Sequence, residues 1–357
     1  MPVSREATAW AMQFLLDQEP DEALVDMHSN AYDSIEDMRT RFLQTAEAEL
    51  LFSNANGSSW DPGRIQKNNS YTIPPFLLRR PVHDNVPWQF TEPSIENPIT
   101  QLCTAEQMQT QHYRDICIRL ALDPAMLHRK VWEFVYIVSA LETRGMLEPG
   151  RRGLGFGTGQ EPLPSVFAKA GVRVVATDAP ADLDFSAAWE KSAQWSNGLE
   201  SLWRPDIVDR DIFFDQVQFR PADMNNIPDD LRDFDFCWSA CCFEHLGSIR
   251  MGLDFLHNSL ATLKPGGISV QTSEFNLGSD TDTLDVPGLA VFLKRDIEQV
   301  MHELIEEGHS VEPLNTWPGA LPVDEHIDLP PYSSPHLKLF MGGQLTTSFG
   351  MIITKKK

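Results

Sequence analysis

The sequence predicts an α/β protein in which a mostly parallel sheet carries helices on both faces, preceded by a small helical N-terminal region. From about residue 153 onward, short apolar runs alternate with longer amphipathic runs, which is typical of strands joined by helical crossovers. A glycine-rich turn directly follows the first apolar run, and apolar residues in the first fifty positions recur at helical spacing. At 357 residues, the chain has room for about two domains.

Residues 1–103 divide into two predicted parts. Residues 1–52 are predicted to form a helical module, in which Asp33 or Ser34 is suited to cap a helix. Residues 53–103 are interpreted as a linker and irregular segment because their first part is rich in Asn, Pro and Gly.

The third part, residues 104–357, is predicted to hold the α/β core. Residues 104–147 show helical patterns, and the segment 130–136 is expected mainly to pack against the core, with Glu133 and Tyr136 as candidates for a lid in the alternative. Strands are expected at Gly153–Phe156, Val172–Thr177, Gln216–Ala222, Phe234–Ala240, Gly267–Thr272, Ser310–Leu314 and Ser348–Thr354. Helices are expected at Pro164–Ala170, Met251–Leu263 and Lys294–Glu307.

The charge balance argues against binding to nucleic acid. Acidic residues number 51 and basic residues 29, so the formal net charge is −22. Nucleic acid is bound by neutralising phosphates with Lys and Arg, and the only basic cluster here is 355–357. The sequence also shows no signal peptide and no apolar stretch near the ~20 residues of a membrane helix, so we expect a cytoplasmic, soluble protein.

The five cysteines do not form a recognisable framework. No CxxC pair occurs and no Cys/His cluster has zinc-ligand spacing, so no metal site is predicted. Cys237, Cys241 and Cys242 lie in an apolar run and are expected to be buried, reduced thiols.

The strongest local signal is the run Gly155-Phe156-Gly157-Thr158-Gly159, between a predicted strand and a predicted helix. Glycines at such a turn allow a sharp bend and leave space for a ligand to approach the backbone. A dinucleotide fingerprint needs a third Gly or Ala three residues after its second glycine. Gln160 and Pro162 occupy the two possible positions, which argues against a nicotinamide-dependent oxidoreductase.

Polar residues follow the next strands where a ligand crevice is expected. Asp178 ends the second strand, where a carboxylate can accept hydrogen bonds from ribose hydroxyls, and a turn or cap is its alternative role. Asp223 and Met224 follow the third strand, and Glu244 and His245 follow the fourth. Ligands of open α/β sheets bind beyond the carboxyl ends of the strands, so these side chains are candidates for a binding site.

The segment 153–272 resembles the class I S-adenosylmethionine-dependent methyltransferases. The resemblance rests on the order of the glycine turn, Asp178, Asp223 and the Glu244-His245 pair, followed by Leu263-Lys264-Pro265-Gly266-Gly267 before the fifth strand. The resemblance implies their Rossmann-like fold, S-adenosyl-L-methionine as the cofactor, and methyl transfer. It implies that the glycines face the methionine part of the cofactor, Asp178 the ribose, Asp223 with Met224 the adenine, and Ser239 with Ala240 the sulfonium. The cofactor-binding residues would then be Gly155, Gly157, Gly159, Asp178, Asp223, Met224 and Ser239.

One position departs from that family. An acid usually precedes the first glycine by two residues, and Gly153 stands there. Glu161 is interpreted as a substitute that holds the amino group of the cofactor. The missing acid also leaves open a methyltransferase-like protein that binds or scaffolds without turnover.

Methyl transfer to a hydroxyl is helped by a base that takes its proton. His245 is the first catalytic candidate because it lies just past the fourth strand and histidine titrates near neutrality. Glu274, at the end of the fifth strand, is the second. A third polar group lies in a Pro-rich segment that is also consistent with a solvated loop: Asp324, His326, Asp328, Tyr332, His336 and Lys338.

The acceptor is expected to be a small molecule or a sugar hydroxyl. The stretches 14–21 and 42–47 resemble a small helical module that accompanies glycan-modifying enzymes in bacterial surface-polysaccharide clusters. This second resemblance implies a glycan substrate and a role in surface-polysaccharide biosynthesis.

Overall fold

The computed structural model describes residues 71–180, 196 and 198–357. The predicted helical module 1–52, with the resemblance it carries, lies outside the described residues.

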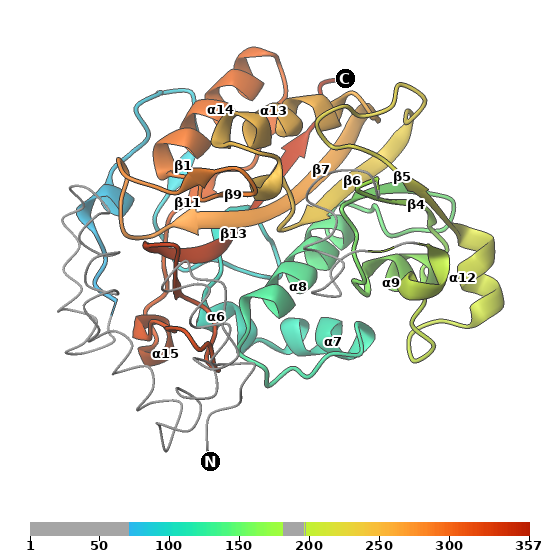
Figure 1. The fold of residues 1–357 in the computed structure, drawn as a ribbon, viewed down its shortest axis with the longest axis horizontal. Helices are drawn as coiled ribbons and strands as arrows, with labels where there is room; N and C mark the ends of the chain where they lie inside the picture. The colour runs from blue at the N-terminus through green and yellow to red at the C-terminus, as the bar shows by residue number, and fades with distance from the viewer. Residues whose placement is uncertain (1–70, 181–195, 197) are drawn as a thin grey trace, which may run out of the picture.

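The centre of the fold is a large, mostly parallel sheet (Figure 1). Its main path runs β5-β4-β3-β6-β7-β13, in which the first five strands are parallel and β13 is antiparallel to β7. With β3 counted as the first strand, this is the doubly wound order 3-2-1-4-5. The strands are β3 Arg152–Phe156, β4 Arg173–Asp178, β5 Val217–Pro221, β6 Phe234–Ala240, β7 Leu263–Asn276 and β13 Gln344–Thr354. The predicted fold class is therefore confirmed.

The sheet continues beyond β13 through short strands. β2 pairs with both β13 and β11, β11 pairs with β1, and β10 and β12 pair with β13. A separate small hairpin joins β8 to β9. The bounds are β1 Trp88–Gln89, β2 Thr100–Leu102, β8 Asp285–Val286, β9 Leu289–Ala290, β10 Ser310–Val311, β11 Leu314–Asn315 and β12 Leu339–Met341.

Helices cover both faces of the sheet. In Figure 1, α13 and α14 lie above it, while α7, α8 and α9 lie below. The longer helices are α7 Gln111–Arg119, α8 Arg129–Glu142, α9 Leu163–Lys169, α12 Arg210–Gln216, α13 Ile249–Leu260 and α14 Lys294–Glu306. The short ones are η1 Pro75–Leu78, α6 Ala105–Met108, α11 Leu199–Leu202, η2 Phe243–His245 and α15 Pro322–Glu325. Among these described helices, none has the length and apolar character to cross a membrane.

Burial explains why the central strands were visible in the sequence. Every residue of β6 is buried, as is usual for a parallel strand covered by helices on both faces, and such strands appear as continuous apolar runs. The caps of two helices also depend only on residues close together in the sequence. The side chain of Ser248 accepts a hydrogen bond from Met251 N at the start of α13, and that of His128 accepts one from Lys130 N at the start of α8.

Two predicted boundaries are corrected by the structure. Residues 88–102 were assigned to the linker 53–103, but β1 and β2 are part of the main sheet, and all of β2 is buried. The predicted strand 310–314 is instead two strands, β10 and β11, that pair with different neighbours. Strands of two or three residues are too short to show the alternation by which a sequence reveals a strand.

Candidate functional site

The glycine turn leaves β3 where β3 and β6 are neighbours and the direction of winding reverses, which is where doubly wound sheets bind ligands. Gly157 and Gly159 have φ values of +55° and +48°, which side chains rarely adopt. A Cβ on Gly157 would also lie 2.8 Å from the sulfur of Cys242. Gly155 has another reason to be glycine, because its Cβ would lie 2.5 Å from the Trp238 ring.

Asp178, at the end of β4, holds this turn in place. Its Oδ2 accepts hydrogen bonds from the backbone N–H groups of Gly159 at 3.1 Å and Ser196 at 2.9 Å. Its Oδ1 accepts one from Ala179 N at 2.8 Å. Burial raises the pKa of Asp178, and these three N–H groups act in the opposite direction. A carboxylate has about four acceptor sites, so these three hydrogen bonds use most of the acceptor capacity of Asp178.

A cavity of about 450 Å³ lies against the glycine turn. Its wall combines the turn with the first half of α8 and the end of β6. Residues from these three sources include Lys130, Phe134, Gly157, Gly159, Glu161 and Cys242.

The structure explains the departure at position 153. A Cβ on Gly153 would lie 2.4 Å from the ring of Phe236, so no acidic side chain fits there. Glu161 instead brings a carboxyl group to the cavity wall, where its Oε1 accepts a hydrogen bond from Trp238 Nε1 at 2.6 Å. Burial raises the pKa of Glu161 to about 8.

The remaining predicted cofactor residues are Met224, Asp223 and Ser239, and they differ in how near they lie to the glycine turn. Met224 lies beside the turn, since a Cβ on Gly157 would be 3.6 Å from its sulfur. Asp223 accepts a hydrogen bond from Asn225 N at 2.8 Å, which stabilises the turn after β5. Ser239 is fully buried and donates to Gln271 Oε1 at 2.5 Å, so it does not reach the cavity.

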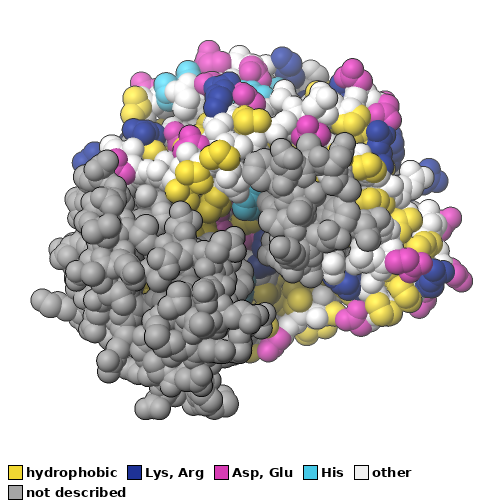
Figure 2. Space-filling view, viewed as in Figure 1, with side chains coloured by type: hydrophobic (Ala, Val, Ile, Leu, Met, Phe, Trp, Pro, Cys, Tyr) yellow, Lys and Arg dark blue, Asp and Glu magenta, His cyan; other side chains and the backbone are white. Residues whose placement is uncertain are grey.

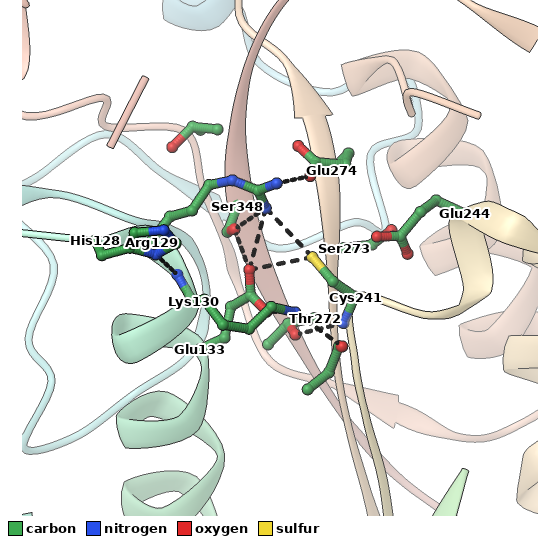
Figure 3. A network of polar contacts seen from close by, with 12 residues as sticks. His128, Arg129, Lys130, Glu133, Cys241, Glu244, Thr272, Ser273, Glu274 and Ser348 are labelled. Carbon is green, nitrogen blue, oxygen red and sulfur yellow. Dashed lines mark hydrogen bonds and ion pairs between the residues drawn. The ribbon is translucent and has the colours of Figure 1, made fainter. Parts of the chain in front are cut away.

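A charged network borders the same edge of the sheet and begins on the first turn of α8 (Figure 3). Arg129 and Lys130 both form ion pairs with Glu133, at 3.2 and 2.8 Å, and Arg129 also pairs with Glu274 of β7. Lys130 Nζ donates to the carbonyl of Ala240 at 3.1 Å, which ties α8 to β6. Burial alone would raise the pKa of Glu133, but Lys130 and Arg129 hold it at about 2.

Cys241 joins the network from the end of β6 with a left-handed backbone, φ +53°. Its thiol donates to Glu133 Oε1 at 3.1 Å. The expectation of a buried thiol is confirmed for Cys237 and Cys242, whereas Cys241 is partly exposed at the cavity wall. Burial raises the pKa of Glu274 to about 7, although Arg129 acts to lower it.

His245 lies in η2, next to this network. Its Nδ1 is 2.7 Å from the carbonyl oxygen of Gly288. A carbonyl oxygen only accepts, so Nδ1 carries the proton and Nε2 is the basic nitrogen of the neutral ring. Nε2 lies 3.9 Å from Oε1 of Glu244, a buried carboxylate whose Oε2 accepts a hydrogen bond from Ser273 at 2.7 Å.

The predicted lid is wrong. Glu133 and Tyr136 are completely buried, and the hydroxyl of Tyr136 donates to Ile99 O at 2.6 Å. Lys130 and Phe134, on the same helix, line the cavity instead. Sequence reasoning therefore missed the role of α8, although the spacing of Arg129, Lys130 and Glu133 on one helical turn is a recognisable ion-pair pattern.

The Pro-rich segment is not a solvated loop. Asp328 is fully buried, pairs with His336 Nδ1 at 2.5 Å and accepts hydrogen bonds from Ser333 N. Asp324 and Lys338, also buried, lie 3.6 Å apart. None of these side chains lines the cavity beside the glycine turn.

Figure 2 shows the charge on one face of the molecule. Acidic and basic side chains are interspersed over the described part of that face, with no continuous basic patch there. A hollow near the centre of the view shows charged and histidine side chains at its base.

Comparisons with solved structures find similar folds at low identity. A carbon methyltransferase, CurJ, is 15% identical with a TM-score of 0.36 over 64% of this chain, and the match spans about half of its length, 54%. An S-adenosylmethionine-dependent methyltransferase from Aquifex aeolicus is 19% identical with a TM-score of 0.32, covering 60% of this chain and 87% of its own. Magnesium protoporphyrin IX methyltransferase from Synechocystis PCC 6803, with bound S-adenosylhomocysteine, is 14% identical with a TM-score of 0.35, covering 62% and 80%. No family model and no curated protein matches this sequence.

Proposed function

We propose that this protein is an S-adenosylmethionine-dependent methyltransferase. The observation that carries the proposal is the glycine turn at the switch point of the sheet, which lines a cavity while Asp178 holds its backbone. The spacing of the turn supports this cofactor over a dinucleotide, because Gln160 and Pro162 stand where the third glycine would be.

The residues of the turn fit the methionine part of this cofactor. Gly157 and Gly159 leave the backbone open to a ligand, and Glu161 offers a carboxyl group to its ammonium. We assign Asp178, which holds the turn, to a ribose hydroxyl, and Met224, which lies beside Gly157, to the adenine. Of the two residues expected on the sulfonium side, Ala240 lines the cavity and Ser239 does not, so we assign Ala240 to it.

The cofactor supplies an activated methyl group on a sulfonium, so the protein has mainly to align the acceptor with it. We assign His245 as the base that takes the acceptor proton on Nε2, because the contact of Nδ1 with Gly288 sets the tautomer. Glu274 is the second candidate, but its ion pair with Arg129 occupies one of its oxygens.

The acceptor class in this proposal is a small molecule or a sugar hydroxyl, with surface-polysaccharide biosynthesis as the setting. The mixed surface charge and the net charge of −22 support a small acceptor over nucleic acid. The glycan part rests on the resemblance in residues 14–21 and 42–47.

Calorimetric titration of the full chain with S-adenosylmethionine, S-adenosylhomocysteine and NAD tests the cofactor. We expect one equivalent of each of the first two to bind and NAD not to bind. Preferential binding of NAD would overturn the proposal. A second assay, transfer of labelled methyl from the cofactor to cell-extract fractions, separates an enzyme from a protein that binds the cofactor without turnover.

A further inference from the structure

We propose that Cys241, Glu244 and Glu274 bind a divalent zinc-like metal ion at the carboxyl edge of the sheet. The three residues come from the position after β6, from η2 and from β7, and Figure 3 shows them bordering the same network. One potential ligand atom from each lies within 4.8 Å of the other two. The sequence did not predict a metal here because Cys241 and Glu244 alone do not make a recognisable ligand pattern, and Glu274 follows thirty positions later.

The two carboxylates are each anchored through one oxygen. Arg129 holds Oε1 of Glu274, and Ser273 donates to Oε2 of Glu244. Oε2 of Glu274 is buried, on a side chain only 3% exposed, and has no hydrogen-bond partner among the described residues. A buried carboxylate oxygen without a partner is costly, and metal ligands are commonly oriented by such outer contacts. We therefore assign the other oxygen of each carboxylate to the metal.

The charges of the network favour a dication. When all three are ionised, Glu133, Glu244 and Glu274 supply three negative charges, and Arg129 and Lys130 supply two positive ones. Once the Cys241 thiol loses its proton to a metal, the group carries an excess of two negative charges. A divalent cation neutralises that excess, whereas the same charges without it are expensive to bury.

The donor set selects the kind of metal. A thiolate with carboxylates suits Zn²⁺ better than Mg²⁺ or Ca²⁺, which prefer oxygen ligands alone. Three protein ligands leave a fourth zinc position open, which is the pattern of catalytic zinc sites. Cys241 also lines the cavity beside the glycine turn. This role rests on the proposed function: an acceptor hydroxyl or thiol at the open position would lose its proton more readily.

Titration with Co²⁺ alone tests the site without any methyl donor. The full chain is treated with a chelator, dialysed, and titrated while the near-ultraviolet thiolate-to-cobalt absorption is recorded. We expect one equivalent to bind with that absorption, and one equivalent of Zn²⁺ to remove it. Absence of saturable binding, or binding without the thiolate absorption, would overturn the proposal.

Two variants test individual ligands, and a third serves as the control. Cys241→Ser should lose the thiolate absorption, and Glu274→Gln should weaken Co²⁺ binding at least about tenfold through loss of a charged ligand. Cys117→Ser, a buried cysteine on α7, is the matched control and should titrate like the wild type. An unchanged spectrum in Cys241→Ser would overturn the assignment. Because the cofactor is titrated separately, failure of cofactor binding and failure of metal binding are told apart.

Discussion

The carboxylate of Asp178 accepts a hydrogen bond from the backbone N–H of Gly159, so the last residue of β4 sets the conformation of the turn that follows β3. The same oxygen also accepts from Ser196 N. Asp178 therefore acts on the cavity through the shape of the turn that lines it.

Asp178→Ala should weaken S-adenosylmethionine binding by about 1–3 kcal/mol, because a ligand hydroxyl and the N–H of Gly159 lose their acceptor together. Isothermal calorimetry measures the change. Asp230→Ala, which removes an exposed carboxylate that does not line the cavity, is the control. Unchanged affinity in Asp178→Ala would mean that neither the ribose nor the turn depends on this residue.

Gly157→Ala should abolish cofactor binding, while Gly266→Ala should preserve it. Both glycines have positive φ, +55° and +77°, so both substitutions strain the backbone. Only at Gly157 does the added Cβ meet a neighbour, at 2.8 Å from Cys242, since nothing lies within 4 Å at Gly266. Equal affinities in the two variants would show that the cavity beside the turn is not the cofactor site.

Binding of the cofactor should release a proton at pH 7. Burial raises the pKa of Glu161 to about 8, so its carboxyl group is mostly protonated at pH 7, whereas an ammonium ion favours the ionised form. Affinity should therefore rise as the pH approaches 8 from below. Calorimetry at pH 7 in buffers of different ionisation enthalpy measures the release.

The Glu161→Gln variant should bind the cofactor more weakly and without proton release. Asp206→Asn, which changes an exposed carboxylate on the same cavity wall, should release the proton as the wild type does. Proton release that persists in Glu161→Gln would assign the linkage to another group.

His245→Ala should keep the affinity for the cofactor and lose roughly 10²–10⁴-fold in turnover, the usual contribution of a positioned base. Methyl transfer to the acceptor identified from extracts is the assay, and His83→Ala, at a partly buried histidine that stacks on His302, is its control. Normal turnover in His245→Ala would remove the base. A larger loss in Glu274→Gln with unchanged Co²⁺ affinity would transfer that role to Glu274.

The positions of Asp178 and His245 were predictable because they follow strands whose burial leaves a clear apolar pattern. β4 and β6 are parallel members of one sheet, so their carboxyl ends meet at one edge wherever the chain travels in between. The direction of a single side chain at that edge was less predictable. Ser239 lies on β6, as predicted, but its side chain donates a hydrogen bond to Gln271 on the neighbouring strand β7.

The sequence by itself determined the order of strands and helices, the glycine turn and the residues that follow each central strand, because these are local patterns with a fixed period. Only the tertiary structure decided which of those residues meet. Arg129 and Glu274 form an ion pair across 145 positions of the chain, and Phe236 excludes an acid from position 153. Contacts of this kind depend on how α8, β6 and β7 pack against one another, and no periodicity within one segment reports the packing between segments.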